Sequence, residues 1–411
     1  MAKKNTAWFI AQRMAFSRQQ SFSRLIIRIA VVAIMLSVTV MHLSTALVQG
    51  FQQEISTKMF GFWGHIQVTK FDRNSSFENS PIPSEQAFVP VLDTMEGIRN
   101  VQAYATKPGI LKEGDNIDGI ILKGVGFDYH WDFLAQQLVE GRLLDLPADT
   151  MAFEILISQT TANRLRLSVE DRLTVNFIDP ETLRIRSRRF SIVGIYNTGI
   201  AESDKLFALV DIRQIQRLNN WGPNQVGGYE VFIDDLDQLQ AMERKVYYEL
   251  PASLNSRTIE QLQPTIFDWL ELQSTNEVVI LVLMIIVAII NMITALLILI
   301  LERTNMIGIL KALGGGNGLI QRVFLINATY IVVVGLVLGN LVGLGLAGLQ
   351  DQFGFIQLPE ETYYVSTAPV AFNWLSIGLI NIGTLFVCLV VLIIPSFLIS
   401  RIQPIKAIRF N

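Results

Sequence analysis

Reactive side chains are scarce in this sequence. The 411 residues include one cysteine, Cys388, so no disulfide can form within the chain. The three histidines, His42, His65 and His130, are far apart, and neither the metalloprotease pattern HExxH nor the hydrolase pattern GxSxG occurs. The sequence therefore predicts no catalytic residue and no metal site. Cys388 lies within an apolar run, where it is expected to be a small packing residue.

A nucleotide-binding loop is missing as well. The phosphate-binding pattern GxxxxGK[ST] does not occur. The glycine-rich stretch 314–318 has no lysine after it and no strand pattern before it, which is typical of a flexible turn. We therefore expect no enzymatic activity and no cofactor bound by this chain. ATP and magnesium, if the protein depends on them, would be used by a separate partner ATPase.

Charge is low, at 17% of the residues, whereas 51% are apolar. Four windows contain no Asp, Glu, Lys or Arg: 29–53, 278–301, 323–350 and 362–400. About 20 apolar residues are enough for a helix to cross the hydrocarbon core of a membrane. The sequence thus predicts four transmembrane helices, the last three at about 278–301, 323–349 and 375–399.

Basic residues mark the cytoplasmic ends of membrane spans. Six precede the first span, three lie in the loop 302–322 and three follow the last span, whereas 351–373 has three acids and no base. Both termini and 302–322 are therefore expected in the cytoplasm, and 54–277 and 351–373 outside. The segment 54–277 holds 32 acidic and 21 basic residues. The basic residues outside this segment lie near the ends of the spans, where they indicate the topology. They do not indicate a nucleic-acid-binding patch, so nucleic-acid binding has no support.

These features predict an α-helical membrane protein with four transmembrane helices and a large mixed α/β extracytoplasmic domain between the first and second spans. Residues 1–53 would form a cytoplasmic interfacial helix and the first span, and 54–276 the outer domain with its stalk helices. Residues 277–411 would form the other three spans, the cytoplasmic segment 302–313 and a basic tail. Aromatic residues and arginines are interleaved in 5–24, which favours an interfacial helix. The first apolar run is long for a signal peptide and no clear small-x-small site follows it, so an uncleaved anchor is expected.

The outer domain shows short strand and helix patterns in alternation. Strands are expected at 65–70, 118–124, 154–158, 172–178, 188–195, 206–210 and 229–233. Helices are expected at 84–98, with Ser84 as the N-cap, and at 159–167, 212–219 and 236–250. More than 200 residues suffice for a core of its own, and a division into two subdomains is expected.

Two spans have features besides apolarity. No Gly or Pro occurs from 265 to 307, so a single long helix is expected to run from the outer domain to the cytoplasmic segment. Asn291 lies in the middle of that span, where its amide needs another helix or a cavity. Gly335, Gly339 and Gly343, with Ala347 next, repeat every four residues in the third span, which predicts close helix packing.

The segment 302–314, ERTNMIGILKALG, lies between the second and third spans. Together with the arrangement of one span, a large domain and three spans, it resembles the FtsX-like permeases of ABC transporters, whose pattern there is about EKTREIGILKALGA. The ending 400–409, SRIQPIKAIR, is similar to that family's closing motif. Within the family the chain most resembles the lipoprotein-releasing (Lol-type) transmembrane subunits. The start WFIAQR at 8–13, Gly50-Phe51 after the first span, Asn291 and the length without an attached ATPase domain carry this resemblance.

The resemblance implies a mechanism called mechanotransmission. Two permease subunits, either copies or paralogues, assemble with two ABC-type ATPase subunits, and ATP-driven closure of the ATPases moves a docking helix. It implies a multi-pass protein of the bacterial inner membrane with its large domain in the periplasm. The substrate would be an acylated lipoprotein taken from the outer leaflet, and the acceptor a periplasmic lipoprotein carrier.

The docking residues that the resemblance assigns are Glu302, Arg303, Ile307, Gly308, Lys311, Ala312 and Leu313. Asn305 and Met306 stand where the family has Arg and Glu. We therefore expect docking to depend more on apolar fit at Ile307, Leu310 and Leu313 than on ion pairs. An amphipathic helix that only lies on the inner leaflet is the alternative for this segment.

Helical spacing and the resemblance favour one face of the first two spans as substrate-lining: Val40, Leu43, Leu47, Phe51, Ile280, Met284 and Asn291. Plain lipid contact or helix packing explains each of these residues equally well. For the whole chain, one alternative is an FtsX-like or efflux-type permease that exports another substrate or activates cell-wall hydrolases. A receptor or structural membrane protein without transport is another.

Overall fold

The computed structural model describes residues 21–72, 77–113, 116–178 and 184–401, so most of the predicted interfacial helix and the closing motif lie outside the described residues. The chain divides into two compact units. The helical unit contains the chain up to residue 53, 269–356 and the chain from 367 onwards, and the α/β unit contains 54–268 and 357–366. The division falls inside helices α2 (Ser21–Trp63) and α10 (Pro264–Glu302), so each of them contributes residues to both units.

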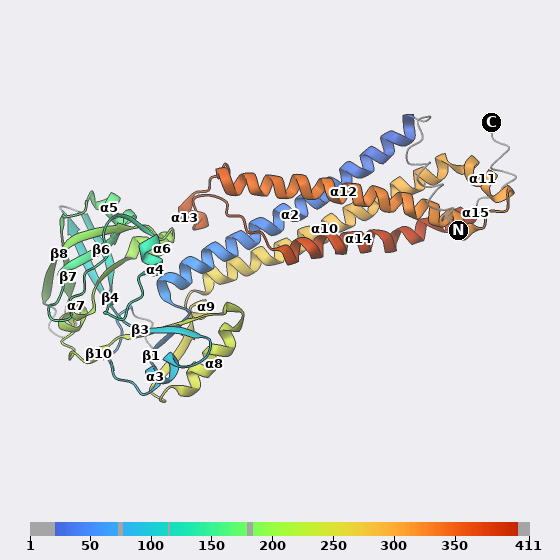
Figure 1. Cartoon of the computed structure of the whole chain (residues 1–411). Helices are drawn as coiled ribbons and strands as arrows, with labels where there is room; N and C mark the ends of the chain where they lie inside the picture. The colour runs from blue at the N-terminus through green and yellow to red at the C-terminus, as the bar shows by residue number, and fades with distance from the viewer. Residues whose placement is uncertain (1–20, 73–76, 114–115, 179–183, 402–411) are drawn as a thin grey trace. The chain divides into compact units, whose positions relative to one another are not determined.

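Four helices of the described chain are long and apolar enough to cross a membrane (Figure 1). They are α2, α10, α12 (Asn317–Phe353) and α14 (Trp374–Ser396). The four predicted spans are therefore confirmed. Two short helices, α11 (Thr304–Ala312) and α15 (Leu398–Arg401), follow α10 and α14.

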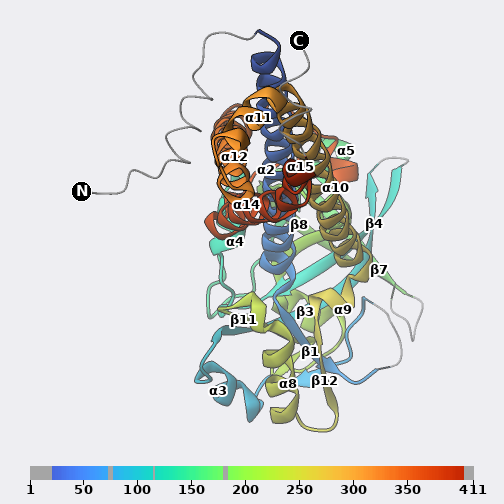
Figure 2. The ribbon, with the colours of Figure 1, turned by 90° about the vertical axis from the view of Figure 1, so that its right-hand side faces the viewer.

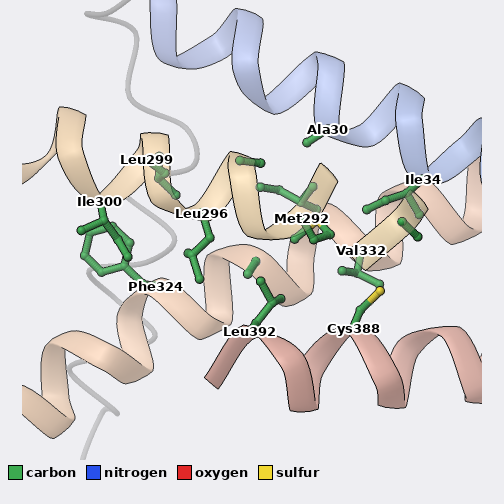
Figure 3. Packing of buried hydrophobic residues seen from close by; sticks show 14 of the residues in the cluster. Ala30, Ile34, Met292, Leu296, Leu299, Ile300, Phe324, Val332, Cys388 and Leu392 are labelled. Carbon is green, nitrogen blue, oxygen red and sulfur yellow. The ribbon is translucent and has the colours of Figure 1, made fainter. Parts of the chain in front are cut away.

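An apolar core joins the four long helices (Figure 3). Each helix contributes fully buried side chains to it: Ala30 and Ile34 from α2, Met292 and Leu296 from α10, Phe324 and Val332 from α12, and Cys388 and Leu392 from α14. The thiol of Cys388 is only 1% exposed, which confirms its predicted packing role. Dense contact between apolar side chains holds these helices together, because lipid tails remove most of the hydrophobic driving force.

The glycines of α12 face α2 at very short range. A Cβ atom added at Gly335 or Gly339 would lie 2.7 Å from the nearest side-chain atoms of Ile34 or Val38, and at Gly343 3.2 Å from His42. The hydroxyl of Thr39 also donates a hydrogen bond to the carbonyl of Gly339 (3.3 Å). These contacts confirm the close packing that the glycine spacing predicts.

The prediction of a single helix that continues to Ile307 is wrong, because α10 ends at Glu302 and α11 begins at Thr304. The hydroxyl of Thr304 donates to the carbonyl oxygens of Ile300 (3.2 Å) and Leu301 (2.6 Å). Such side-chain bonds to the preceding turn compete with the helical ladder and bend helices. Thr294 donates the same kind of bond to Ile290 within the unbroken part of α10, so this bond accompanies the break and is not sufficient to cause it.

The α/β unit contains one large sheet and a two-stranded ribbon of β10 (Gln225–Val226) and β2 (Ile82–Pro83). The order in the large sheet is β12-β1-β11-β3-β4-β9-β6-β8-β5, and β7 pairs with both β3 and β8. Its strands are β1 (Ile66–Lys70), β3 (Ile98–Glu113), β4 (Asn116–Val125), β5 (Leu138–Gly141), β6 (Glu154–Ser158), β7 (Arg172–Ile178), β8 (Ile185–Tyr196), β9 (Phe207–Asp211), β11 (Gly228–Ile233) and β12 (Leu254–Thr258). All seven predicted strands are present.

The double pairing of β7 closes a ring of six strands, β3-β4-β9-β6-β8-β7. Strands β12, β1 and β11 extend the sheet from the first part of β3, where β11 pairs with residues 98–104. The long strand β3 belongs to both parts, so they share one continuous hydrogen-bonded sheet. The helices of the unit are α3 (Phe88–Asp93), α4 (Asp132–Gln136), α5 (Gln159–Leu165), α6 (Ala201–Leu206), α7 (Ile212–Leu218), the 3-10 helix η1 (Leu236–Gln238), α8 (Leu239–Glu249), α9 (Ile259–Leu262) and α13 (Glu360–Tyr363).

The prediction of a helix at 84–98 with Ser84 as its N-cap is wrong. Only α3 forms there, its N-cap position is Ala87, and no side chain caps it. The backbone N–H of Ser84 donates to the carbonyl of Asn224 (2.9 Å), and the carbonyl of Ser84 accepts from the hydroxyl of Tyr229. These long-range bonds hold Ser84 beside the short ribbon, so the local capping preference is overridden.

His65 is buried between the end of α2 and strand β1. Its Nδ1 accepts a hydrogen bond from the N–H of Ile233 (3.1 Å), which only an imidazole without a proton on that nitrogen can do. Burial, and then the positive charge of Arg99, lower the pKa of His65 to about 4. Because an unfolded histidine titrates near pH 6.5, the unfolded chain binds more protons between pH 6.5 and 4. Stability is therefore lost as the pH falls through this window.

We expect the α/β unit to lose about 2 kcal/mol of unfolding free energy between pH 7 and pH 5, and the His65→Gln variant to lose much less. Glutamine offers an oxygen to Ile233 but does not titrate. Urea titration of the full chain in detergent at both pH values measures the difference. An equal loss of unfolding free energy in the variant would show that groups other than His65 cause the pH dependence.

Candidate functional site

Helix α11 lies at the same end of the helical unit as α15, next to the ends of α10 and α12 (Figure 1, Figure 2). The ammonium of Lys311 donates a hydrogen bond to the carbonyl of Ile399 (2.7 Å), which ties α11 to the end of the last span. Partial burial lowers the pKa of Lys311. The segment is therefore folded against the bundle and is not a loose connection between spans.

The two faces of α11 differ in what they contact. Ile307 and Gly308 are buried, and Met306 and Leu310 pack against the apolar core of the bundle. The opposite face is exposed and consists of Asn305, Ile309, Ala312 and Leu313, which we call the outward face. Ile309 is 49% exposed and Leu313 is 80% exposed. The helical unit thus presents large apolar side chains outward beyond the ends of two spans.

The structure separates the predicted docking residues into four groups. Ala312 and Leu313 lie on the outward face, whereas Ile307 and Gly308 point inward and hold the helix in place. Lys311 is engaged by Ile399. Glu302 and Arg303 are half-buried at the junction of α10 and α11, and within the described chain Glu302 Oε2 and Arg303 Nε have no hydrogen-bond partner.

Ile309 and Asn305 belong to the outward face but are not among the predicted docking residues. Their spacing to Ala312 and Leu313 is that of one helix face, so the periodicity of the segment contained the signal. The match to the family motif drew attention instead to Ile307 and Gly308. An apolar contact at this site would therefore rest on Ile309 and Leu313, with Leu310 only partly accessible.

The predicted substrate-lining residues lie on α2 and α10. Val40 is 39% exposed, and the other six, Leu43, Leu47, Phe51, Ile280, Met284 and Asn291, are half-buried. Phe51 meets Trp269 edge to face, with ring centroids 6.2 Å apart, and Met284 packs against the bundle core. The structure brings Phe51 and α10 together but shows no cavity shared by all seven residues in its described part.

The amide of Asn291 forms no hydrogen bond within the described chain. Its side chain is half-exposed in the middle of α10, the span with the smallest buried share of the four, 17%. An unpaired amide in hydrocarbon costs free energy. This face of α10 is therefore suited to contact with a polar group from another molecule.

A polar cavity of about 580 Å³ lies beside the part of α2 that contains Phe51. It is lined by Gln49, Gln52, Gln53 and the segment 371–375. The amide of Gln52 donates to Ser274 on α10 (2.5 Å), and that of Gln49 donates to Ser376 on α14 (2.9 Å). Within the described chain the Oε1 atom of Gln49 has no partner. Three glutamines therefore give this end of the bundle a hydrogen-bonding surface.

The described residues contain no cluster of three or more His, Cys, Asp or Glu side chains that could hold a metal ion. The fold defines a polytopic membrane protein with a large α/β domain, and α11 gives its helical unit an exposed apolar surface.

Comparison with known proteins assigns this subunit to a family. The model of the MacB-like periplasmic core domain matches residues 29–246, more than half of the chain, and the model of the FtsX-like permease C-terminal region matches 278–404. The chain therefore belongs to the FtsX-like, MacB-type family of ABC transporter permeases, and its α/β unit is a domain of the periplasmic type.

Individual relatives are similar over nearly the full length. The lipoprotein-releasing system transmembrane protein LolC of Xylella fastidiosa is 23% identical, with 96% of each chain covered. The corresponding LolE protein of Haemophilus influenzae is 20% identical, with 98% of this chain and 99% of its own covered. The periplasmic region of MacB from Actinobacillus actinomycetemcomitans covers 49% of this chain and 91% of its own at 16% identity, with a TM-score of 0.34.

Proposed function

We propose that this permease extracts lipoproteins from the outer leaflet of the inner membrane and passes them to a periplasmic carrier on the way to the outer membrane. The observation that carries the proposal is the near-full-length similarity to relatives named for lipoprotein release. That similarity includes the spans and the α/β unit together, so it concerns the whole working subunit rather than one shared module.

In this proposal the energy enters at α11. A separate ABC-type ATPase binds the outward face, and its closure on ATP and magnesium moves α11. Ile307 is fully buried against the bundle, so α11 cannot move without displacing the ends of α10 and α12. The proposal has both termini and α11 in the cytoplasm, which the basic residues around 302–322 support.

The substrate would be an acylated polypeptide, and its chemistry explains the need for ATP and a carrier. Each CH₂ group moved from lipid into water costs about 0.8 kcal/mol, so an acyl chain leaves the membrane only with an input of work and an apolar shelter. Val40 and the half-buried apolar residues of α2 and α10 would line its path. The glutamines beside Phe51 would meet its polar head group.

A second permease subunit, a copy or a paralogue, is part of the proposal. Asn291 and the largely uncovered surface of α10 support a facing chain or substrate at this position. The alternative function is export of another substrate or activation of a cell-wall hydrolase. The observation that favours it is the match to a core domain named for MacB and not for lipoprotein release.

Co-purification tests the proposal. Full-length protein solubilised in mild detergent is expected to carry an ABC-type ATPase and acylated proteins, both identified by mass spectrometry. The Leu313→Asp variant should lose the ATPase. Recovery of an ATPase together with a cell-wall hydrolase, and without acylated proteins, would favour the alternative function.

A further inference from the structure

A lysine and a glutamate are buried together where α2 ends within the α/β unit. The side chain of Lys123 on β4 is 1% exposed and that of Glu230 on β11 is 0% exposed, and Lys123 Nζ lies 2.7 Å from Glu230 Oε1. Neither residue belongs to the outward face of α11 or to the predicted substrate surface. Charged groups are almost never fully buried without a specific arrangement around them.

The lysine binds the end of α2 directly. Its ammonium donates a hydrogen bond to the carbonyl oxygen of Phe62, in the last turn of the helix, and the amide of Gln67 donates to the next carbonyl, that of Trp63 (3.1 Å). Carbonyl groups in the last turn of a helix have no partner within it and carry a partial negative charge. A cation at this place therefore both caps the helix and compensates its dipole.

Aromatic rings surround the ammonium on its other sides. The Nζ atom of Lys123 lies 4.9 Å from the ring centroid of Phe62, 5.7 Å from that of Trp63, 5.8 Å from Tyr129 and 6.0 Å from Tyr104. Ring faces attract a desolvated cation. Two of these rings belong to the last residues of α2, so cation–π contacts also bind the ammonium to the end of the helix.

The residues of this network lie on four consecutive strands, β1, β11, β3 and β4, and those on β1, β11 and β3 are in register. Gln67 is directly opposite Glu230, and Glu230 is directly opposite Gln102. The amide of Gln102 donates to Glu230 Oε2 (2.8 Å). Tyr104, two residues on from Gln102 and thus on the same face, donates its hydroxyl to Gln67 Oε1 (3.1 Å).

The turn that follows α2 requires glycine. Gly64 has a φ of 73°, and an added Cβ atom would lie 3.0 Å from the side chain of Glu230. A flexible turn next to a helix end would let the helix bend away from the sheet. The bonds to Phe62 and Trp63 remove that freedom, because they attach the helix itself, before the turn, to β4 and β1.

Stability alone does not account for the pair. A well-packed apolar pair of similar size is often as stable as a buried ion pair or more so, whereas the ion pair adds direction and a unique geometry. We infer that Lys123 and Glu230 form a clamp that fastens the last turn of α2 to the sheet, so that a displacement of α2 moves the sheet instead of bending the chain at Gly64. Both are positioning residues, and this inference rests on the proposed function.

The double variant Lys123→Met/Glu230→Leu tests the clamp, because it leaves no buried charge unpaired and should fold. In the reconstituted complex with its ATPase, we expect ATP hydrolysis within twofold of the original and release of acylated protein per ATP reduced at least fivefold. Amide hydrogen exchange at 63–65 should accelerate at least tenfold, while that of β9 should not change. The matched control is Lys107→Met/Glu78→Leu, which removes a less buried ion pair of the same unit and should leave release and exchange unchanged.

Normal release per ATP in the double variant would overturn the inference, and so would unchanged exchange at 63–65. The exchange measurement does not depend on the transported substrate. If the original complex releases no acylated protein, the proposed function fails, and the exchange result still decides whether the ion pair holds the helix end.

Discussion

Replacing Leu313 by aspartate should weaken binding of the partner ATPase by about 30- to 1000-fold and abolish ATP-driven transport. Leu313 is 80% exposed next to Ile309 on the outward face of α11, so the substitution leaves the fold intact. In the proposed interface the carboxylate would be buried without a partner, which costs several kcal/mol. Loss of a central apolar anchor costs about 2–4 kcal/mol, which corresponds to this range of affinity. Fluorescence titration of the full chain in detergent with purified ATPase measures it.

The matched control is Asn317→Asp, which places the same charge at the first residue of α12, where an acid is favourable to the helix. Its binding should stay within about twofold of the original. Binding should also change little in moderate salt, because the interface is predicted to be apolar rather than ionic. Undiminished binding by Leu313→Asp would remove the outward face as the docking surface, and strong loss in moderate salt would show that ion pairs dominate.

Replacing Gly339 by leucine should destabilise the helical unit by about 2–3 kcal/mol or more. A Cβ atom at this position would lie 2.7 Å from the Cβ of Val38, and the nearest backbone atom is the carbonyl oxygen of Met35 at 3.0 Å. The α2 and α12 helices would therefore have to separate, which opens the apolar core around Ile34 and Val332. Thermal unfolding of the full chain in detergent should show a clearly lower midpoint.

The control for this prediction is Gly345→Leu on the same helix. Nothing lies within 4 Å of a Cβ atom added there, so the same side chain meets open space. Its effect should stay within about 0.5 kcal/mol, in line with surface substitutions. If both variants were equally stable, the glycine stripe would have no part in helix association.

Sequence patterns were sufficient to predict the spans and most strands, because both kinds of element depend on a local pattern of residues. A span needs an uncharged run of fixed length, and a strand needs only a local pattern, which is a short apolar run in β6 and alternation in β7. The longest strand, β3, was missed because Pro108 and Gly109 interrupt its pattern. Of its partners, β4 is the next strand along the chain, whereas β11 and β7 are distant in sequence, and pairing with all three supports what the local residues do not favour.

The candidate site was predictable in place but not in orientation. The motif located α11 correctly between two spans, yet it did not show that Ile307 points into the bundle and Ile309 away from it. The orientation of α11 depends on which of its faces packs against α12 and the end of α14. These are tertiary contacts, which a local motif does not contain. The Lys123–Glu230 pair was beyond any local pattern, because its network is assembled from four strands with long sequence separations.

Reconstitution tests the central claim most directly. The chain would be placed in proteoliposomes with its ATPase, any paralogous permease and a triacylated protein, and the acylated protein released to a soluble carrier would be measured with and without ATP. The account predicts release that requires ATP and the carrier and that is lost in the Leu313→Asp variant. ATP hydrolysis by the intact complex without any release of the acylated protein would contradict it.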